Sequence, residues 1–464
     1  MLKPGLALSI ALLAAGCTVG PDYRPRAAPP AAEGRFVTPV AGADAAAALP
    51  DDWWRLYRDP VLDRLVARAL TANTDLRVAA ANLARAQAVL SEYRANRLPT
   101  TNVSAGTSYG DAQPGMAARD TPQGAVNAGF AAAWEVDLFG RVRRAIEAAR
   151  ADADAVAAAR DAVRVAVAAE TARSYVDACA YADAAAVARQ SLGIAEDNLR
   201  LVTLRQQAGS AARLNVEQAA ADVASAKAQV APLNGRREAA LFELAALIGE
   251  TPAGVPHEAA ACQAAPAPIA MLPIGDGAGL LRRRPDLREA ERRLAADNAR
   301  IGVATADLYP RISLGGSAGF LHNQDVSGGQ SFSFSFGPLL SWSFPNISVA
   351  RARIRQARAQ GDASLATFDG KVLTALKEVE QALAAYRAEG VRRAALLDGV
   401  GRAQAAFDLA DARYRAGSSS YLDLLVAQRT LIGARATLAD STQKLGSTRI
   451  DLFKALGGGW QTAQ

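Results

Sequence analysis

The sequence is poor in aromatic, histidine and cysteine residues. Only 6% of its 464 residues are aromatic, and it contains two histidines and three cysteines. His257, His322 and so few thiols cannot supply a histidine–cysteine metal cluster, and a disulfide framework would need more cysteines. Cys179 falls in a helical pattern and Cys262 in a Pro/Ala-rich stretch. Two free thiols are therefore favoured, with a single bridge as the alternative.

The chain also lacks long runs of one charge. It carries 52 Lys and Arg against 46 Asp and Glu, interleaved along the sequence, for a net charge of +6. Without a basic cluster, nucleic acid is an unfavoured partner. No Gly-rich phosphate loop, HExxH or GxSxG motif occurs, so the sequence predicts no catalytic residues, no metal site and no cofactor, and hence no enzyme.

Long hydrophobic runs are absent except at the start of the chain. An apolar run at Leu6–Ala15 follows Lys3 and is too short to span a bilayer, which is typical of an export signal. It ends in Ala-Gly-Cys, the layout of a bacterial lipoprotein signal in which Cys17 becomes the lipid-bearing first residue. Thr18, which is not Asp, favours sorting to the outer membrane. The alternative is an ordinary signal peptide with an incidental cysteine.

What the chain does contain is an internal repeat. Asp75–Pro99 aligns without a gap to Asp286–Pro310, with 9 of 25 positions identical. The turn at Arg205–Ala221 recurs, 208 residues later, at Arg413–Arg429. Residues 141–208 contain no proline, and as one helix they would extend on the order of 100 Å. The repeated unit is therefore predicted to be helix, strand hairpin, long helix, turn and helix.

Four stretches alternate between apolar and small or polar residues, which predicts strands with two unlike faces. They lie at 100–110, 125–139, 311–320 and 330–344; the last contains QSFSFSF. A soluble sandwich would show the same alternation. In a bilayer, however, four strands cannot close a barrel, and an open sheet edge is forbidden. Three copies would supply twelve strands around a lumen, whereas two copies would give eight strands and a filled interior.

The predicted fold is thus a mixed α/β membrane protein with an internal two-fold sequence repeat. Four transmembrane β-strands per chain complete a 12-stranded trimeric barrel, and long helices make up most of the rest; the resemblance described below implies that these helices form a tunnel. The expected segments are a signal peptide (1–16), an N-terminal segment (17–50), first-repeat helices (51–99), a strand hairpin (100–140), tunnel helices turning near 209 (141–250), a connector (251–285), a second-repeat helix (286–310), a second hairpin (311–345), tunnel helices turning near 417 (346–457) and a tail (458–464).

Several motifs in this order resemble one known family. They are GCTVGPDYRP (16–25), DDWWRLYRDP (51–60), WEVDLFGRVRR (134–144), LLRRRPDLREAE (280–291), YRAGSSSYLDLLVAQ (414–428) and LFKALGGGW (452–460). Over nearly the whole chain from Cys17, the sequence is similar to the lipid-anchored outer-membrane efflux channels of the TolC-like family, which serve resistance-nodulation-division pumps. The resemblance implies a homotrimer in the outer-membrane lipids. It also implies that the barrel is continued by a long α-helical periplasmic tunnel, which tapers to a closed tip.

The resemblance also implies roles for the two Gly-Ser turns. Gly209, Ser210, Gly417 and Ser418 would lie at the tip, where a periplasmic adaptor (membrane fusion protein) docks. The plainer interpretation is that glycine and serine merely make a good helix turn, and both can hold together.

One acidic residue follows the second turn. Three copies of Asp423 around a narrow lumen would form an acidic ring that favours cations and gates the tip. The plainer alternative is a carboxylate that stabilises a helix N-terminus. Family channels often carry a second acidic residue where this chain has Val426, so one acidic and one apolar layer are expected here. Arg429 and Tyr414 match family positions involved in closing the tip.

The function hypothesis is an outer-membrane exit channel of a tripartite efflux pump. It would passively conduct small toxic compounds received from an inner-membrane resistance-nodulation-division transporter. Two rivals remain: a duct of the same fold for type I protein secretion, and a periplasmic structural lipoprotein without a pore.

Overall fold

The computed structural model describes residues 18–25, 30–47, 49–111, 122–266 and 271–458. Cys17 and the expected signal peptide lie outside the described residues. The chain divides into two compact units, each built from three separate segments. Unit 1 comprises residues 1–26, 82–157 and 288–370, and unit 2 comprises residues 27–81, 158–287 and 371–464.

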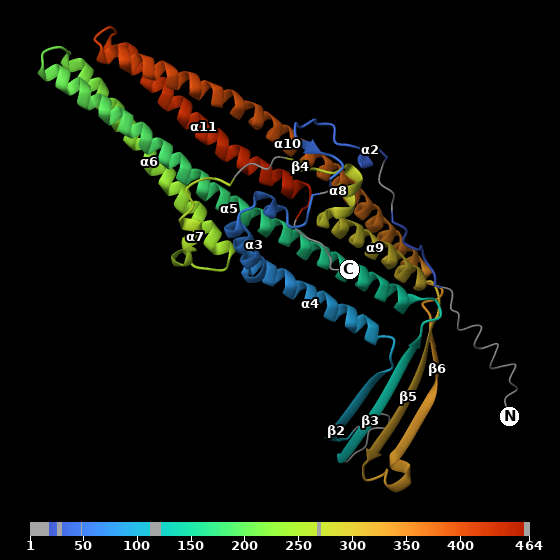
Figure 1. Cartoon of the computed structure of the whole chain (residues 1–464). Coiled ribbons are helices and arrows are strands. Elements are labelled where there is room, and N and C mark those ends of the chain that lie inside the picture. The colour runs from blue at the N-terminus through green and yellow to red at the C-terminus, as the bar shows by residue number, and fades with distance from the viewer. Residues whose placement is uncertain (1–17, 26–29, 48, 112–121, 267–270, 459–464) are drawn as a thin grey trace. The chain divides into compact units, whose positions relative to one another are not determined.

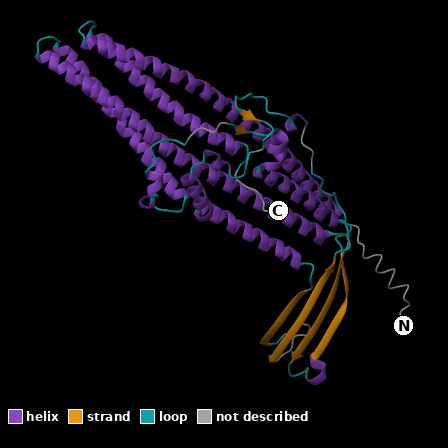
Figure 2. Ribbon diagram, viewed as in Figure 1, coloured by secondary structure: helices purple, strands orange, loops and turns teal. Residues whose placement is uncertain are grey.

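Unit 1 contains a four-stranded antiparallel sheet (Figure 2). Its strands, in sheet order, are β2 (Thr100–Gly110), β3 (Gln123–Val136), β5 (Arg311–His322) and β6 (Phe332–Ser341). The short 3-10 helix η3 (Gly328–Ser331) precedes β6. The order leaves β2 and β6 at the two ends of the sheet, each paired with a single neighbour among the described residues.

The sheet has one apolar face and one face of small and polar residues. Pairing across the four strands places in one row Val103, Phe130, Ala318 and Phe334, and in the next row Ser104, Gly129, Gly319 and Ser333. Side chains of successive residues point to opposite faces of a sheet. Phe334 is 89% exposed, so the apolar face is uncovered within this chain. The period-2 stretch around QSFSFSF therefore corresponds to a two-faced strand.

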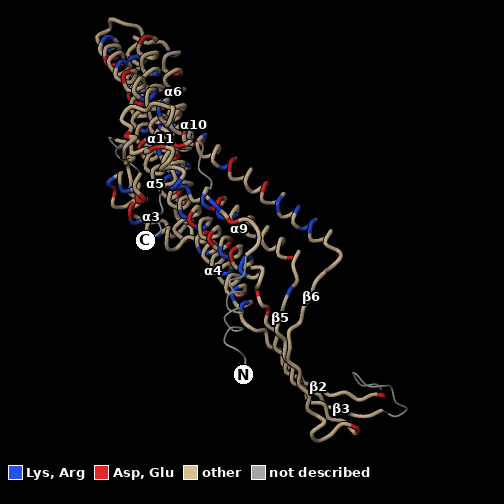
Figure 3. The backbone as a smooth tube through the Cα atoms, turned by 90° about the vertical axis from the view of Figure 1, so that its right-hand side faces the viewer, with Lys and Arg blue, Asp and Glu red and all other residues tan. Residues whose placement is uncertain are grey.

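Charged residues are scarce on these strands. Figure 3 shows Lys, Arg, Asp and Glu concentrated along the helices, whereas the strands are almost entirely uncharged. The exceptions are Glu135 and Arg311, which lie at or near strand ends. An uncharged sheet with an exposed apolar face is suited to lipid contact.

Long helices make up most of the remaining chain, and they pair by length. The helices of 67 and 69 residues are α5 (Arg141–Gln207) and α10 (Ile347–Arg415), those of 35 residues are α6 (Arg213–Leu247) and α11 (Tyr421–Ala455), and those of 22 residues are α4 (Thr74–Ala95) and α9 (Pro285–Ala306). Many of the buried α5 residues are alanines, whose small side chains allow close helix packing. No helix in the described part of the chain is long and apolar enough to cross a membrane.

The main hydrophobic core lies in unit 2. The 3-10 helix η1 (Trp53–Tyr57) places Trp53 at its centre, fully buried, with its ring 4.9 Å from that of Phe453. Asp59 caps the next helix, α3 (Pro60–Ala72), by accepting hydrogen bonds from its first backbone N–H groups. The same carboxylate accepts a 2.9 Å hydrogen bond from the Tyr175 hydroxyl, which ties α3 to α5.

Short elements in unit 2 belong to the N-terminal segment and the connector. They are α2 (Pro30–Glu33), β1 (Ala43–Asp44), η2 (Pro252–Gly254), α7 (His257–Ala260), β4 (Leu272–Pro273) and α8 (Gly277–Arg283). Strands β1 and β4 pair in parallel, so the N-terminal segment lies along the connector.

The expectation of two free thiols is wrong. Cys179 of α5 and Cys262 of the connector form a disulfide, with their Cα atoms 5.2 Å apart. The two positions are 83 residues apart in sequence. Their local patterns could not show that the connector returns to the surface of α5 after the α5–α6 hairpin.

Candidate functional site

The two long helical hairpins end in turns at the same end of unit 2 (Figure 1, upper left). The first turn joins α5 to α6 and the second joins α10 to α11. A small apolar cluster packs the hairpins together just before the turns; among its members are Val202, Ala219, Tyr414, Tyr421 and Leu424.

The two turns end their long helices in the same way. Gly209 and Gly417 have φ angles of +74° and +76°, a conformation that glycine adopts without steric cost. The N–H of Ser210 donates to the carbonyl of Arg205 at 2.8 Å, and the N–H of Ser418 donates to the carbonyl of Arg413 at 2.9 Å. Each serine hydroxyl also donates to the same carbonyl. These are Schellman motifs, which satisfy the last carbonyls of a helix.

The helices that follow begin differently. Ser420 caps α11: its hydroxyl accepts a 3.2 Å hydrogen bond from the N–H of Asp423, whose carboxylate accepts from the Ser420 N–H at 3.1 Å. This reciprocal pair is a capping box. The corresponding residue before α6 is Ala212, which has no side-chain cap. Asp423 therefore has the plainer helix-capping role, whatever further role it performs.

Asp423 and Val426 lie on an exposed side of α11. Asp423 is exposed, Val426 is 56% exposed, and Leu422 beside them is 61% exposed. Residues three and four apart share a helix face, so an acidic and an apolar group stand together here without cover from this chain.

Tyr414, by contrast, is buried, and it joins the two hairpins. The guanidinium of Arg205 lies 4.1 Å from the centre of its ring and donates 2.6 Å and 3.1 Å hydrogen bonds to the backbone carbonyls of Tyr414 and Arg415. The Tyr421 ring lies 5.8 Å from that of Tyr414. Sequence reasoning missed Arg205, because its repeat position next to a turn gave no sign of a partner in the other hairpin.

Arg429 forms a second connection between the hairpins. Its guanidinium grips the Asp222 carboxylate of α6 with contacts of 2.7, 3.0 and 3.1 Å, a bidentate ion pair. The hydrogen bond with Asp222 raises the pKa of Arg429, while burial and then the Asp222 charge raise the pKa of Tyr421 to about 12. Asp222 is a further residue that the sequence did not reveal. Arg429 and Asp423 thus have separate partners within the chain.

A buried amide pair lies deeper in the same helices. Asn198 of α5 donates its side-chain N–H to the side-chain oxygen of Gln428, which is 1% exposed. Near the turns, polar contacts thus join the two hairpins from Arg205 to Tyr414, from Asp222 to Arg429 and from Asn198 to Gln428.

Comparison with known proteins agrees with this geometry. The family model described as outer membrane efflux protein matches residues 65–250 and 279–458. The solvent efflux pump outer membrane protein SrpC of Pseudomonas putida is 33% identical over 98% of this chain and 97% of its own length. Outer membrane protein OprJ of Pseudomonas aeruginosa is also 33% identical, over 99% of this chain and 97% of its own.

Solved structures show the same fold. The outer-membrane channel OprN superposes with a TM-score of 0.88 at 35% identity, covering 96% of this chain and all of that one. The MtrE outer membrane channel of Neisseria gonorrhoeae, solved in its open state, gives 0.79 at 28% identity over 96% of this chain and 98% of that one.

A four-stranded sheet continued by paired long helices, in this element order, defines the subunit of an outer-membrane channel of the TolC-like kind. The chain belongs to the outer membrane efflux protein family. Such proteins are transport channels of the Gram-negative outer membrane that extend into the periplasm, and they are not enzymes.

Proposed function

We propose that the chain is the outer-membrane exit channel of a tripartite efflux pump and that it works as a homotrimer. The observation that carries the proposal is the sheet of unit 1, whose apolar face is uncovered and whose end strands, β2 and β6, each have one free edge among the described residues. An unpaired edge in a bilayer leaves N–H and C=O groups without partners, so further strands must complete it. Three copies supply twelve strands and an aqueous lumen.

The remaining roles follow from that assembly. Lipid on Cys17 anchors the chain, and the helices of three copies enclose a tunnel. The turns at Gly209–Ser210 and Gly417–Ser418 are exposed and rigidly capped, which suits them to receive a periplasmic adaptor. The adaptor links the channel to an inner-membrane resistance-nodulation-division transporter, which supplies the energy; the channel conducts small toxic compounds passively.

The first experiment tests pore formation. Purified full-length protein is examined on gels without heating and in planar lipid bilayers. The proposal expects a heat-sensitive trimer and discrete conductance steps. A monomer that never conducts would instead support the pore-free structural lipoprotein. Restored drug resistance in a strain lacking its own exit channel, without restored protein secretion, separates efflux from type I secretion.

The second experiment tests the gate. The proposal holds that Asp423 forms an acidic ring, that Val426 forms an apolar layer beside it, and that Tyr414 and Arg429 hold the tip closed. Asp423→Asn keeps the shape of the side chain and removes its charge, so cation preference should fall about threefold in reversal-potential measurements. Ser420→Ala is the matched control, because it disrupts the same capping box and leaves the charge. Equal effects of both variants would reduce Asp423 to a helix cap.

A further inference from the structure

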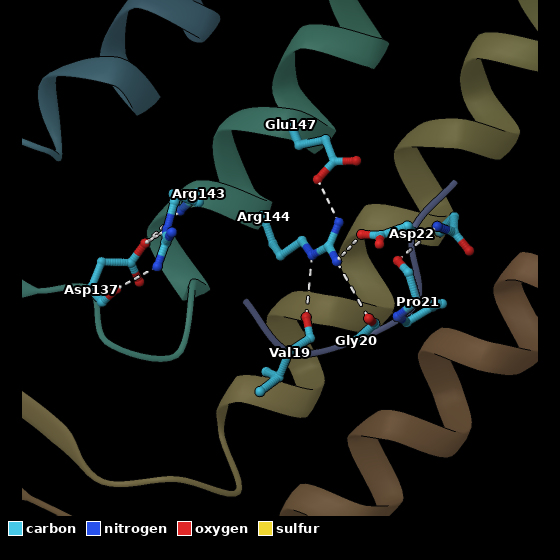
Figure 4. Close-up of polar contacts among 9 residues, drawn as sticks. Val19, Gly20, Pro21, Asp22, Asp137, Arg143, Arg144 and Glu147 are labelled. Carbon is cyan, nitrogen blue, oxygen red and sulfur yellow. Dashed lines mark hydrogen bonds and ion pairs between the residues drawn. The ribbon is translucent and has the colours of Figure 1, made fainter. Parts of the chain in front are cut away.

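An extended segment directly after Cys17 lies in unit 1 against the start of α5 and against α9 (Figure 4). We name residues 18–23 the strap. Its sequence is Thr-Val-Gly-Pro-Asp-Tyr. The strap belongs to neither the sheet nor the long helices. It is nevertheless held by side chains, by backbone groups and by close contacts with glycines.

Arg144 of α5 provides the side-chain contacts. The guanidinium, with a side chain only 4% exposed, donates from Nε to the Val19 carbonyl at 3.2 Å and from Nη2 to the Gly20 carbonyl at 3.3 Å. Nη2 also pairs with the Asp22 carboxylate at 2.6 Å, and Nη1 pairs with Glu147 of the same helix at 2.8 Å. Figure 4 shows these bonds converging on the one side chain.

A buried guanidinium needs such partners. Burial alone would lower the pKa of Arg144, but the hydrogen bonds and charges of Asp22 and Glu147 outweigh it, and the pKa is raised. Its other polar contacts are with two uncharged backbone carbonyls of the strap, and these hydrogen bonds fix the position of the strap backbone. Arg144 thus recognises the path of the strap backbone together with one carboxylate, which a lysine with its single charged atom could not do.

Backbone and neighbouring side chains hold the rest of the strap. The Val19 N–H donates to the Phe139 carbonyl at 3.2 Å, and Asn298 of α9 donates to the Pro21 carbonyl at 3.1 Å. The Tyr23 hydroxyl donates to Glu291 of α9 at 3.2 Å. Burial and then Glu291 raise the pKa of Tyr23 to about 12, so this hydroxyl remains a hydrogen-bond donor at neutral pH.

Three glycines form a cradle that any side chain would obstruct. A Cβ on Gly20, whose φ is +92°, would lie 2.4 Å from the Cα of Gly302. A Cβ on Gly140, whose φ is +79°, would lie 2.7 Å from the Cγ2 of Thr18. A Cβ on Gly302 would also approach the Arg144 side chain within 2.8 Å. The strap therefore fits the surface formed by the start of α5 and by α9 in shape as well as in charge.

We propose that the strap is a docked segment, that Arg144 is the positioning residue that holds it, and that this docking keeps the strap in place without a lipid on Cys17. Thr18 touches Gly140, four residues after β3 ends at Val136. Thr18, the first described residue of the chain, is therefore held close to the end of a strand.

Hydrogen exchange on the full-length trimer in detergent tests the docking directly. In the wild type, the Val19 amide should exchange much more slowly than in an unstructured peptide, because its N–H donates to the Phe139 carbonyl. Arg144→Gln and Gly302→Ala should each accelerate that exchange at least about tenfold. Glu147→Gln is the matched control: it removes the charge of one Arg144 partner without touching the strap, and less than about a twofold change is expected.

Asp22→Asn tests the docking with a substitution that should not affect folding. The Asp22 side chain is 83% exposed, so its replacement threatens no core, and exchange should rise about threefold. Unchanged exchange on the β3 amides shows that the sheet is intact. Fast exchange of the wild-type strap, or no change in Arg144→Gln and Asp22→Asn, would overturn the docking.

Palmitate labelling separates this inference from the anchor proposal. Cys17→Ser should abolish labelling and leave exchange of the strap slow, whereas Arg144→Gln should be labelled as fully as the wild type. Retained labelling in Cys17→Ser would refute the lipid anchor alone. Loss of slow exchange in Cys17→Ser would show that the lipid holds the strap, and Arg144 would lose its positioning role.

Discussion

The two tip turns end their helices alike and begin the next ones differently. Gly209 and Gly417 share one backbone conformation, and the serines after them make the same two hydrogen bonds. Beyond the turn, α11 starts with a capping box and α6 with an uncapped alanine. The shared helix ends are what a chain needs to stop one helix and turn back into the next. The different helix starts can carry a role that only one of the two turns performs.

The cross-connections are unequal as well. Arg205, four residues before the first glycine, reaches the second hairpin and stacks on Tyr414. Its counterpart, Arg413, is exposed. The first hairpin therefore contributes the arginine side chain, and the second contributes the aromatic ring and the carbonyls that the arginine contacts. The two hairpin ends of one chain are therefore of two kinds.

The largest expected effect comes from breaking that grip. Arg205→Ala removes a stacked cation and two hydrogen bonds to carbonyls, which should lower the local opening free energy of the tip by about 2 kcal/mol. Arg413→Ala, the matched control, should cost less than about 0.5 kcal/mol. Native-state hydrogen exchange of the tip amides measures both. Similar losses in the two variants would mean that the hairpins are held symmetrically.

The shared glycines should respond equally. Gly209→Ala and Gly417→Ala each force a side chain into the left-handed region, at a cost of about 1 kcal/mol. No heavy atom lies near either Cβ position, so backbone strain is the whole effect. Exchange of the Ser210 and Ser418 amides reports the two turns separately. A clear difference between the effects of the two substitutions would show that the two turns are not equally stable.

The smallest effect concerns the helix starts. Ser420→Ala should destabilise the first turn of α11 by about 0.5–1 kcal/mol, and Ala212→Ser with Asn215→Asp should stabilise the start of α6 by a similar amount. The exchange rates of the first amides of each helix give both values. If the rebuilt first turn also gains cation selectivity in bilayers, Asn215 faces the lumen as Asp423 does, and the functional asymmetry proposed here is wrong.

Local sequence patterns predicted the parts of the fold that are locally determined. Alternation of Phe and Ser identified the strand at Phe332–Ser341, because the face of a strand residue depends only on its parity. Absence of proline indicated that α5 runs unbroken for 67 residues. Proline is nevertheless a weak stop here: Pro232 lies inside α6, where packing outweighs the lost hydrogen bond.

Contacts between distant segments could not be predicted in this way. Asp222 and Arg429 are 207 residues apart, and Asp22 and Arg144 are 122 apart. Lys, Arg, Asp and Glu are interleaved throughout the helices, so the sequence offers each charged residue many possible partners and does not show which one it contacts. The motif GRVRR indicated the family, but the sequence held no sign that its last arginine lies buried against a strap from the N-terminus.

The bridge between Cys179 and Cys262 makes the first hairpin a covalently closed loop. All of the chain between them, including the first tip turn, belongs to a ring that closes over a sequence separation of 83 residues, and Arg387, which matches Cys179 in the second repeat, is not a cysteine. Closing such a ring lowers the entropy of the unfolded chain, which stabilises the folded state by about 4.5 kcal/mol. A thiol reductant would therefore loosen one hairpin of each subunit and spare the other. Maturation of the channel is correspondingly tied to the oxidising power of the compartment in which it folds.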